Sequence, residues 1–176
     1  MAAVCDECYK RVVLRNGTIV TFRPLAKSDL ESMRRLFNSF SQETVYFRFL
    51  APIRVMDEEA IERYLDVDYV HAVAIVATVA EEGKERFIGV ARYYADEKNP
   101  ERAEFAIAIC DEWQRKGVGT ELMKHLCDVA RKRGVKLFYA LAFKDNIGLF
   151  KLLNRIGVAW DKMKFDEDTV RVEFLL

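Results

Sequence analysis

The chain is poor in the residues that build metal centres and disulfide frameworks. It has two histidines, which share no paired spacing, and four cysteines among 176 residues. A zinc site needs about four ligands, so the single C-x-x-C of Cys5 and Cys8 does not supply one. We therefore expect no metal site and reduced thiols, with Cys5 and Cys8 solvated and Cys110 and Cys127 packed as small apolar residues.

The chain also lacks an excess of charge and a long apolar run. Its 28 basic residues balance 28 acidic ones, whereas contacts with nucleic-acid phosphates normally require a basic excess. No run approaches the roughly 20 apolar residues that span a bilayer, and no signal-peptide segment follows the start methionine. We expect a soluble cytoplasmic protein with neither nucleic acid nor membrane as a partner.

The apolar content is large enough for a sizeable core. Half of the residues are hydrophobic, at 51%, and there are no internal repeats, low-complexity segments or clear linkers. We expect a single domain over residues 1–176, in which residues 1–11 form a flexible N-terminal segment.

The periodicity of apolar residues predicts a mixed α+β order. A hairpin at 12–22 turns at Asn16-Gly17, a helix begins at Ser28 with a capping box to Glu31, and a second short helix begins at Asp57. Later elements are strands at 71–79, 87–95 and 102–110, a helix at 117–133, a strand at 136–143, a helix at 146–156 and two closing strands around the turn 166–168.

The stretch Gln114-Arg115-Lys116-Gly117-Val118-Gly119-Thr120 joins a predicted strand to a predicted helix. A helix N-terminus carries unpaired N–H groups and the positive end of the helix dipole, so it binds phosphate oxygens. The stretch is not a P-loop, and position 122 is Leu122, which breaks the dinucleotide fingerprint. The alternative is a glycine-containing turn before an ordinary surface helix.

The remaining pattern, Gln/Arg-x-x-Gly-x-Gly/Ala, resembles the acyl-CoA pyrophosphate loop of the GNAT superfamily of N-acetyltransferases. Asn146 and Gly157 match a second signature, in which an asparagine opens a helix and a glycine closes it. The runs 14–18, 22–25 and 41–49 resemble the Pat-type bacterial protein lysine acetyltransferases. The resemblance implies the GNAT fold: a largely antiparallel central sheet of about seven strands, splayed between the fourth and fifth and flanked by four helices.

Glu104 is the candidate catalytic residue. It is an acid in the otherwise apolar strand 103–109, on one face with Ala106 and Ala108. Small neighbours and burial would strengthen it as a base for an amine, and it matches the general-base glutamate of Pat-type enzymes. The alternative is an edge-strand glutamate that faces solvent.

The resemblance implies acetyl-CoA as cosubstrate. The backbone near Ile109, at an implied bulge, would hold the thioester carbonyl, and Asn146 would bind the pantetheine arm or cap its helix. The residues expected to bind acetyl-CoA are Ile107, Ala108, Ile109, Gln114, Arg115, Lys116, Gly117, Val118, Gly119, Thr120, Asn146, Leu149, Phe150 and Leu153.

Leu153 marks a departure from the wider superfamily. Many members carry a tyrosine there as the general acid for the leaving thiolate, and Pat-type domains commonly lack it. A thiol with a pKa of about 8.5 is a tolerable leaving group without that acid. The departure also leaves open a module that binds acyl-CoA without turning it over.

The region from Phe40 to Arg63 is expected to recognise the acceptor. Its aromatic run 46–49 could line a groove, and Glu43, Asp57, Glu58 and Glu59 could attract a cation, although core packing and helix capping also account for them. The leading hypothesis is an acetyl-CoA-dependent acetyltransferase acting on protein lysines. A small-amine acetyltransferase and an acyl-CoA sensor are the alternatives. The acceptor, acyl chain length, regulation and oligomeric state stay open.

Overall fold

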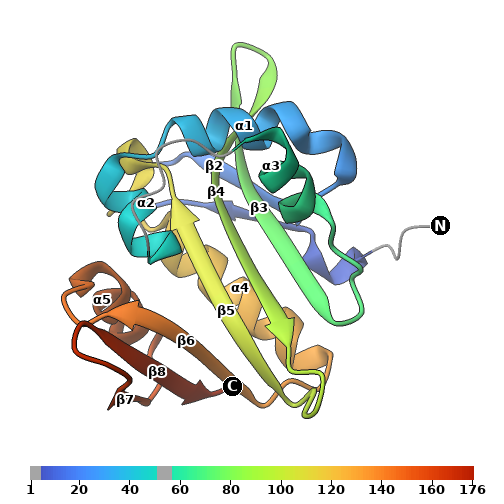
Figure 1. The fold of residues 1–176 in the computed structure, drawn as a ribbon. Helices are drawn as coiled ribbons and strands as arrows, with labels where there is room; N and C mark the ends of the chain where they lie inside the picture. Colours follow the sequence, from blue (N-terminus) through green and yellow to red (C-terminus); the bar gives the residue numbers. More distant parts are fainter. Residues whose placement is uncertain (1–4, 51–56) are drawn as a thin grey trace.

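A computed structural model describes residues 5–50 and 57–176, which form one open sheet with helices on both faces (Figure 1). The strand order is β1-β2-β3-β4-β5-β6-β8-β7. The strands are β1 (Lys10–Val13), β2 (Ile19–Pro24), β3 (Ala72–Glu81), β4 (Lys84–Ala95), β5 (Arg102–Ile109), β6 (Leu137–Phe143), β7 (Trp160–Lys164) and β8 (Thr169–Leu175).

The helices divide between the two faces of the sheet. Those described are α1 (Leu30–Asn38), α2 (Gln42–Phe49), α3 (Glu58–Leu65), α4 (Val118–Lys132), α5 (Ile147–Ile156) and the short 3-10 turns η1 (Asp6–Cys8), η2 (Lys27–Asp29) and η3 (Asp111–Trp113). Figure 1 shows α1, α2 and α3 in front of the sheet and α4 and α5 behind it. The front face of β6, β8 and β7 has no helix over it in this view.

The sheet opens between β5 and β6. These strands are parallel and pair only from Arg102–Leu137 to Glu104–Tyr139, whereas the other neighbouring pairs are antiparallel. The pairing ends at Glu104, and Figure 1 shows the rest of β5 diverging from β6. These are the strands predicted at 102–110 and 136–143, the fourth and fifth of the seven that the resemblance implied. The splay expected between them is confirmed, and so is the GNAT-type mixed α/β architecture.

The element counts are higher than the sequence predicted. The described residues contain eight strands and five α-helices, one more of each than the family resemblance implied, because both strands of the predicted 12–22 hairpin join the sheet and α2 is an additional helix. The sequence did not reveal α2 because Val45, Tyr46 and Phe47 are consecutive and Phe49 follows closely, so no apolar stripe with helical spacing stands out.

The start of α1 also differs from the prediction. The helix begins at Leu30, and Ser28 lies inside η2 rather than capping α1. Asp29 instead stabilises the turn before α1, since its carboxylate accepts a hydrogen bond of 2.8 Å from the Ala26 N–H. The predicted start of α3 is confirmed, because the Asp57 carboxylate accepts from the Ala60 N–H at 2.8 Å.

The N-terminal segment is packed from Cys5 onward, which corrects the expectation of a flexible stretch at residues 1–11. Cys5 and Cys8 are fully buried and joined by a disulfide, so the expectation of a solvated, reduced pair was wrong. The physical reason is tertiary: η1 packs against β2 and α4, and the Cys8 carbonyl accepts a 2.9 Å hydrogen bond from the ring Nε2 of His125.

The expected bulge in β5 is not found. The register between β4 and β5 runs without interruption from Gly89–Ile109 to Ala95–Ala103. The register shift in this part of the sheet lies between β3 and β4, at Ala77 and Thr78. The splay therefore follows from the short parallel pairing of β5 with β6 and not from an extra residue in β5.

The core forms where α4 packs on the sheet. The apolar stripe expected on this helix is confirmed, since Val118, Leu122, Leu126, Val129 and Ala130 are at most 1% exposed. Cys110 and Cys127 are free and buried, as predicted, and burial raises the pKa of the Cys127 thiol to about 12. None of the described helices is long and apolar enough to cross a membrane.

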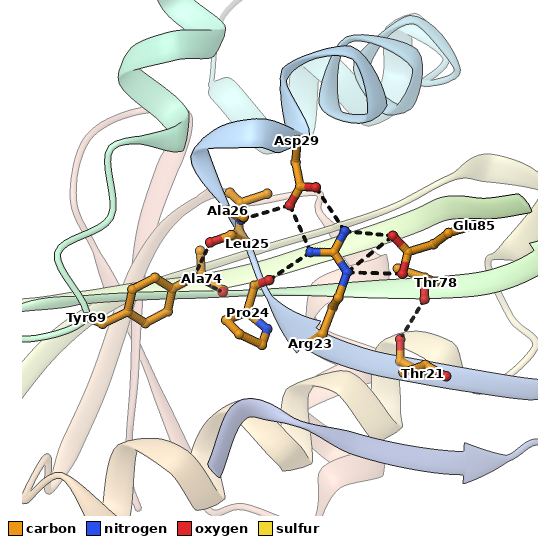
Figure 2. Close-up of polar contacts among 10 residues, drawn as sticks. All are labelled: Thr21, Arg23, Pro24, Leu25, Ala26, Asp29, Tyr69, Ala74, Thr78 and Glu85. Atoms are coloured by element: carbon orange, nitrogen blue, oxygen red, sulfur yellow. Dashed lines mark hydrogen bonds and ion pairs between the residues drawn. The ribbon is translucent and has the colours of Figure 1, made fainter. Parts of the chain in front are cut away.

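A charge cluster fixes the front corner where the chain leaves β2 (Figure 2). The Arg23 guanidinium donates to both carboxylate oxygens of Asp29, at 2.8 and 2.9 Å, and to Glu85 at the start of β4. It also donates to the Pro24 carbonyl at 2.9 Å. Because Asp29 holds the Ala26 N–H as well, Asp29 and Arg23 together connect β2, the turn before η2 and the β3–β4 hairpin.

Replacing Asp29 by Ala should lower the free energy of unfolding by about 2 kcal/mol, because it leaves Arg23 and the Ala26 N–H without their acceptor. The matched variant Glu85→Ala should cost less than about 1 kcal/mol, since the Glu85 side chain is 43% exposed. Urea unfolding of both variants measures the difference. Equal losses would contradict a central role for Asp29.

Candidate active site

A cavity of about 820 Å³ lies in the splay between β5 and β6. Its walls come from five elements that are distant in sequence: β5, β6, the start of α4 with the loop before it, α5, and α2. The lining includes Glu104, Ile107, Ala108, Ile109, Gln114, Arg115, Gly117, Gly119, Thr120, Asn146 and Leu149. The structure therefore brings most of the sequence-predicted site residues to one cavity.

The loop before α4 has the backbone of an anion site. Arg115 and Gly117 both have positive φ, at 60° and 94°, and a non-glycine residue in this region is uncommon and strained. Gly117 is the N-cap residue and has no side chain to occupy the helix end. The N–H groups of Val118, Gly119 and Thr120 are thus the free donors of the first helical turn, at its positive pole.

Glycine occupies positions 117 and 119 of this loop for different structural reasons. Gly117 is required by its conformation, since φ of 94° disfavours any side chain. A Cβ on Gly119 would lie 3.4 Å from Ile109 Cγ1 and 3.9 Å from Leu152 Cδ1, which is ordinary packing contact. A side chain at this position would therefore point toward β5 and α5.

The exposed edge of β5 offers backbone groups to the cavity. The Cys110 N–H donates to Ile88 of β4 at 2.8 Å, and because backbone direction alternates along a strand, the N–H groups of Ile107 and Ile109 point to the opposite edge. The Gln114 side chain donates to the Ile109 carbonyl on that edge at 3.1 Å. An extended ligand could pair with the remaining groups as an added strand.

Asn146 stands at the end of β6 and caps α5. Its Oδ1 accepts a hydrogen bond from the Leu149 N–H at 3.0 Å, so the capping role expected as one alternative is present. The side-chain NH₂ is not used by the cap, and Asn146 lines the cavity. One residue can therefore order the helix and still donate to a ligand.

Glu104 lies where β5 and β6 part, at the other end of the cavity wall from the α4 loop. Its side chain is exposed, so the expected burial was wrong, although it does face the cavity. Tyr94 and Tyr139 are its cross-strand neighbours. Burial and a hydrogen bond to Asp96 raise the pKa of Tyr139 to about 12.

Helix α2 crosses the open end of the splay and contacts both sides of it. On the β5 side, the Asp111 carboxylate accepts from the Ser41 N–H at 2.9 Å and from the Thr44 hydroxyl at 3.0 Å. Burial alone would raise the pKa of Asp111, but the hydrogen bonds from Ser41 and Thr44 outweigh it and hold the pKa below its ordinary value. On the β6 side, Tyr46 stacks on Phe143 with ring centroids 4.2 Å apart.

A buried arginine supports the front wall beside Glu104. Arg92 of β4 is 1% exposed, lies 3.9 Å over the ring of Tyr64, and donates to the Tyr64 carbonyl at 3.0 Å. Burial alone would raise the pKa of Tyr64, but the charges of Arg48 and Arg92 outweigh it and lower the pKa. This stack fixes α3 on the sheet next to the cavity.

Four of the residues predicted to bind a cofactor do not line the cavity. Val118 and Leu153 are fully buried in the core, Phe150 stacks on Trp160 with centroids 5.4 Å apart, and the Lys116 ammonium lies 4.9 Å from the centroid of the Trp113 ring. The Val118 backbone N–H remains available at the helix start. Leu153 sits in the core, so its position offers no group to a leaving thiolate.

Of the four acids proposed to attract an acceptor, one lines the cavity and three do not. Glu43 and Arg48 line the cavity together with Phe47 and Phe49. Asp57 caps α3, and Glu58 and Glu59 pair with Arg34 and Arg63. For these three acids the capping and ion-pair interpretation is the one that the structure bears out.

Several lining residues were not found from the sequence. They are Asp111, Leu141, Ala142, Lys151, Leu152 and Arg155. The spacing of Lys151 and Arg155 after Asn146 would place all three on neighbouring turns of one helix, which was the available signal. In residues 5–50 and 57–176, no three His, Cys, Asp or Glu side chains gather as metal ligands.

Comparison with known proteins gives relatives that are named acetyltransferases. A family model described as the acetyltransferase (GNAT) domain matches residues 20–159. The Pseudomonas aeruginosa protein named acetyltransferase PA5475 is 35% identical over 144 residues, which cover 82% of this chain and 77% of that protein. Acetyltransferase Pat of Mycolicibacterium smegmatis is 32% identical over 149 residues, covering 85% of this chain and 44% of that protein.

A solved structure matches the whole architecture. The GNAT domain of S. lividans PAT superposes with a TM-score of 0.87 at 29% sequence identity, covering 97% of this chain and 98% of that one. The chain thus corresponds to one domain of that protein and to less than half of the M. smegmatis relative.

Replacing Gly117 by Ala should lower the free energy of unfolding by about 1–2 kcal/mol, because the left-handed conformation crowds a Cβ. Gly119→Ala, two residues away, should change it by less than about 0.5 kcal/mol, since the added methyl makes ordinary contacts and Ala favours the helix. Urea unfolding compares the two variants. A larger loss for Gly119→Ala would show that this loop geometry is wrong.

Proposed function

The chain belongs to the GNAT acetyltransferase family, and from this premise we propose that it transfers the acetyl group of acetyl-CoA to lysine side chains of proteins, with Glu104 as the general base. The observation that carries the proposal is the layout of one cavity. A helix start with unpaired N–H groups lies at one end, a free strand edge runs along the wall, and the exposed carboxylate of Glu104 stands at the other end.

Acetyl-CoA fits this layout in an extended conformation. The pyrophosphate would accept from the N–H groups of Val118, Gly119 and Thr120. The pantetheine arm would then follow the free edge of β5, where Ile107 has its N–H and carbonyl available, and Asn146 would donate from the opposite wall. The rise from Ile109 to Glu104 is roughly 17 Å at the usual spacing of a strand, which suits an extended arm.

The reaction needs a base for the amine proton and a hydrogen-bond donor for the thioester carbonyl oxygen. The neutral lysine nitrogen attacks the thioester carbon, the C–N bond forms, the C–S bond breaks and coenzyme A leaves as a thiolate. Glu104 takes the proton from the amine, directly or through water. The Ile107 N–H, which lies on the free edge nearer to Glu104 than that of Ile109, would stabilise the oxygen of the tetrahedral intermediate. The thiolate can depart unprotonated, because a thiol pKa of about 8.5 makes it a tolerable leaving group.

Two features support a protein lysine as the acceptor. The runs 14–18, 22–25 and 41–49 resemble Pat-type protein lysine acetyltransferases, and the relatives named Pat share the sequence or the fold over most of this chain. In addition, α2 presents Phe47, Phe49 and Glu43 to the cavity, a combination that suits the aliphatic stem and the ammonium head of lysine.

Replacing Glu104 by Gln should lower kcat by about 100-fold or more, because the amide cannot accept the proton. The dissociation constant of acetyl-CoA should stay within about twofold, since Glu104 is remote from the phosphate loop. Steady-state kinetics and calorimetry measure the two quantities. Glu97→Gln, an exposed acid in the β4–β5 turn, is the matched control, and an unchanged kcat in Glu104→Gln would remove Glu104 from the mechanism.

Labelled acetyl-CoA incubated with a lysate of the source organism should place label in discrete protein bands, and hydrolysed bands should yield acetyl-lysine. The signal should disappear with Glu104→Gln. Label confined to the small-molecule fraction would overturn the protein acceptor in favour of a free amine. Confirmed acetyl-CoA binding without any transfer would favour the sensor hypothesis instead.

A further inference from the structure

Two basic residues on α5 line the cavity without a role in the proposed reaction. Lys151 and Arg155 are both exposed and both belong to the cavity wall. Within residues 5–50 and 57–176, neither forms an ion pair or a side-chain hydrogen bond. They are four residues apart, so they share one face of the helix and lie about 6 Å apart along its axis.

The contact between α4 and α5 places these two cations near the phosphate loop. Leu152, next to Lys151, lies 3.9 Å from where a Cβ of Gly119 would stand. Gly119 is in the first turn of α4, whose N–H groups form the anion site. Lys151 therefore lies one residue from the contact with that turn, and Arg155 follows one helical turn further along α5.

We propose that Lys151 and Arg155 bind the 3′-phosphate of acetyl-CoA and so select 3′-phosphorylated coenzyme A over its dephosphorylated form. The inference rests on the proposed function, because it takes the pyrophosphate to lie on the α4 loop. The ribose that carries the 3′-phosphate is attached directly to the pyrophosphate. Since the pantetheine arm enters the splay toward Glu104, the ribose must leave the loop on its outer side, along α5.

The negative charge of the 3′-phosphate is complementary to the positive charge of Lys151 and Arg155 on the cavity wall. A phosphate monoester carries nearly two negative charges at neutral pH, and two adjacent cations can each donate a charge-assisted hydrogen bond to it. The acids that line the cavity lie on other elements: Glu43 on α2, Glu104 on β5 and Asp111 in η3, where it is bound by Ser41 and Thr44. A cationic acceptor amine is attracted to those acids and repelled by Lys151 and Arg155, so the α5 pair does not suit the acceptor.

The test compares the binding of coenzyme A and 3′-dephospho-coenzyme A by calorimetry, which requires no turnover. The unmodified protein should bind coenzyme A about tenfold more tightly than the dephosphorylated form, from two partly exposed ion pairs. In the double variant Lys151→Met, Arg155→Met this ratio should fall to about one, with affinity lost for coenzyme A and retained for the dephosphorylated form. Higher salt should reduce the ratio in the unmodified protein.

The matched control removes two charges elsewhere. Lys124 and Lys132 are exposed on α4 and outside the cavity, so Lys124→Met, Lys132→Met should keep the tenfold ratio. Equal affinities in the unmodified protein, or equal losses for both ligands in the α5 variant, would overturn the inference. A raised acceptor KM with an unchanged ratio would also overturn it and assign the pair to the acceptor.

The inference and the proposed function fail in different ways. A protein that shows the expected ratio but acetylates no acceptor would overturn the proposed function and leave the 3′-phosphate site standing. A protein that acetylates lysine through Glu104 but binds both ligands equally would do the reverse.

Discussion

The parallel pairing of β5 with β6 is the constraint on which the site depends. It covers only Arg102–Glu104 opposite Leu137–Tyr139, and the strands part where the pairing ends. The divergence frees one edge of β5 while β4 holds the other in unbroken register. A strand edge left open between two halves of a sheet has N–H and C=O groups without partners in the sheet, and in the proposed function an extended thioester arm would pair with them. The cavity is thus a consequence of how the sheet is paired.

Helix α2 connects the two halves of the opened sheet. Its N-terminal end is bound to Asp111 beside the phosphate loop, and its aromatic side chains rest on Phe143 of β6. The same helix presents Phe47 and Phe49 to the cavity. The loop before α4 and the end of β6 are therefore both in contact with α2, through hydrogen bonds on one side and stacking on the other.

The sequence predicted the parts of the site that depend on local pattern. The helix start at Gly117, the buried stripe of α4 and the cap of α5 at Asn146 all follow from spacing and from the residue types that begin helices. Predictions that depended on the surroundings of a residue were less successful. Glu104 is exposed rather than buried, and Cys5 and Cys8 are buried rather than solvated, because burial is set by which elements pack over a segment.

The sequence by itself determined the strand–loop–helix unit around Gly117, the order of most of the elements and the family, since these reside in contiguous residues and local backbone preference. Only the tertiary structure decided that β5 carries no bulge, that α2 bridges the splay, and that Lys151 and Arg155 stand beside the loop. These features join residues that are far apart along the chain. Their distances depend on strand register and helix packing, which no local pattern of residues encodes.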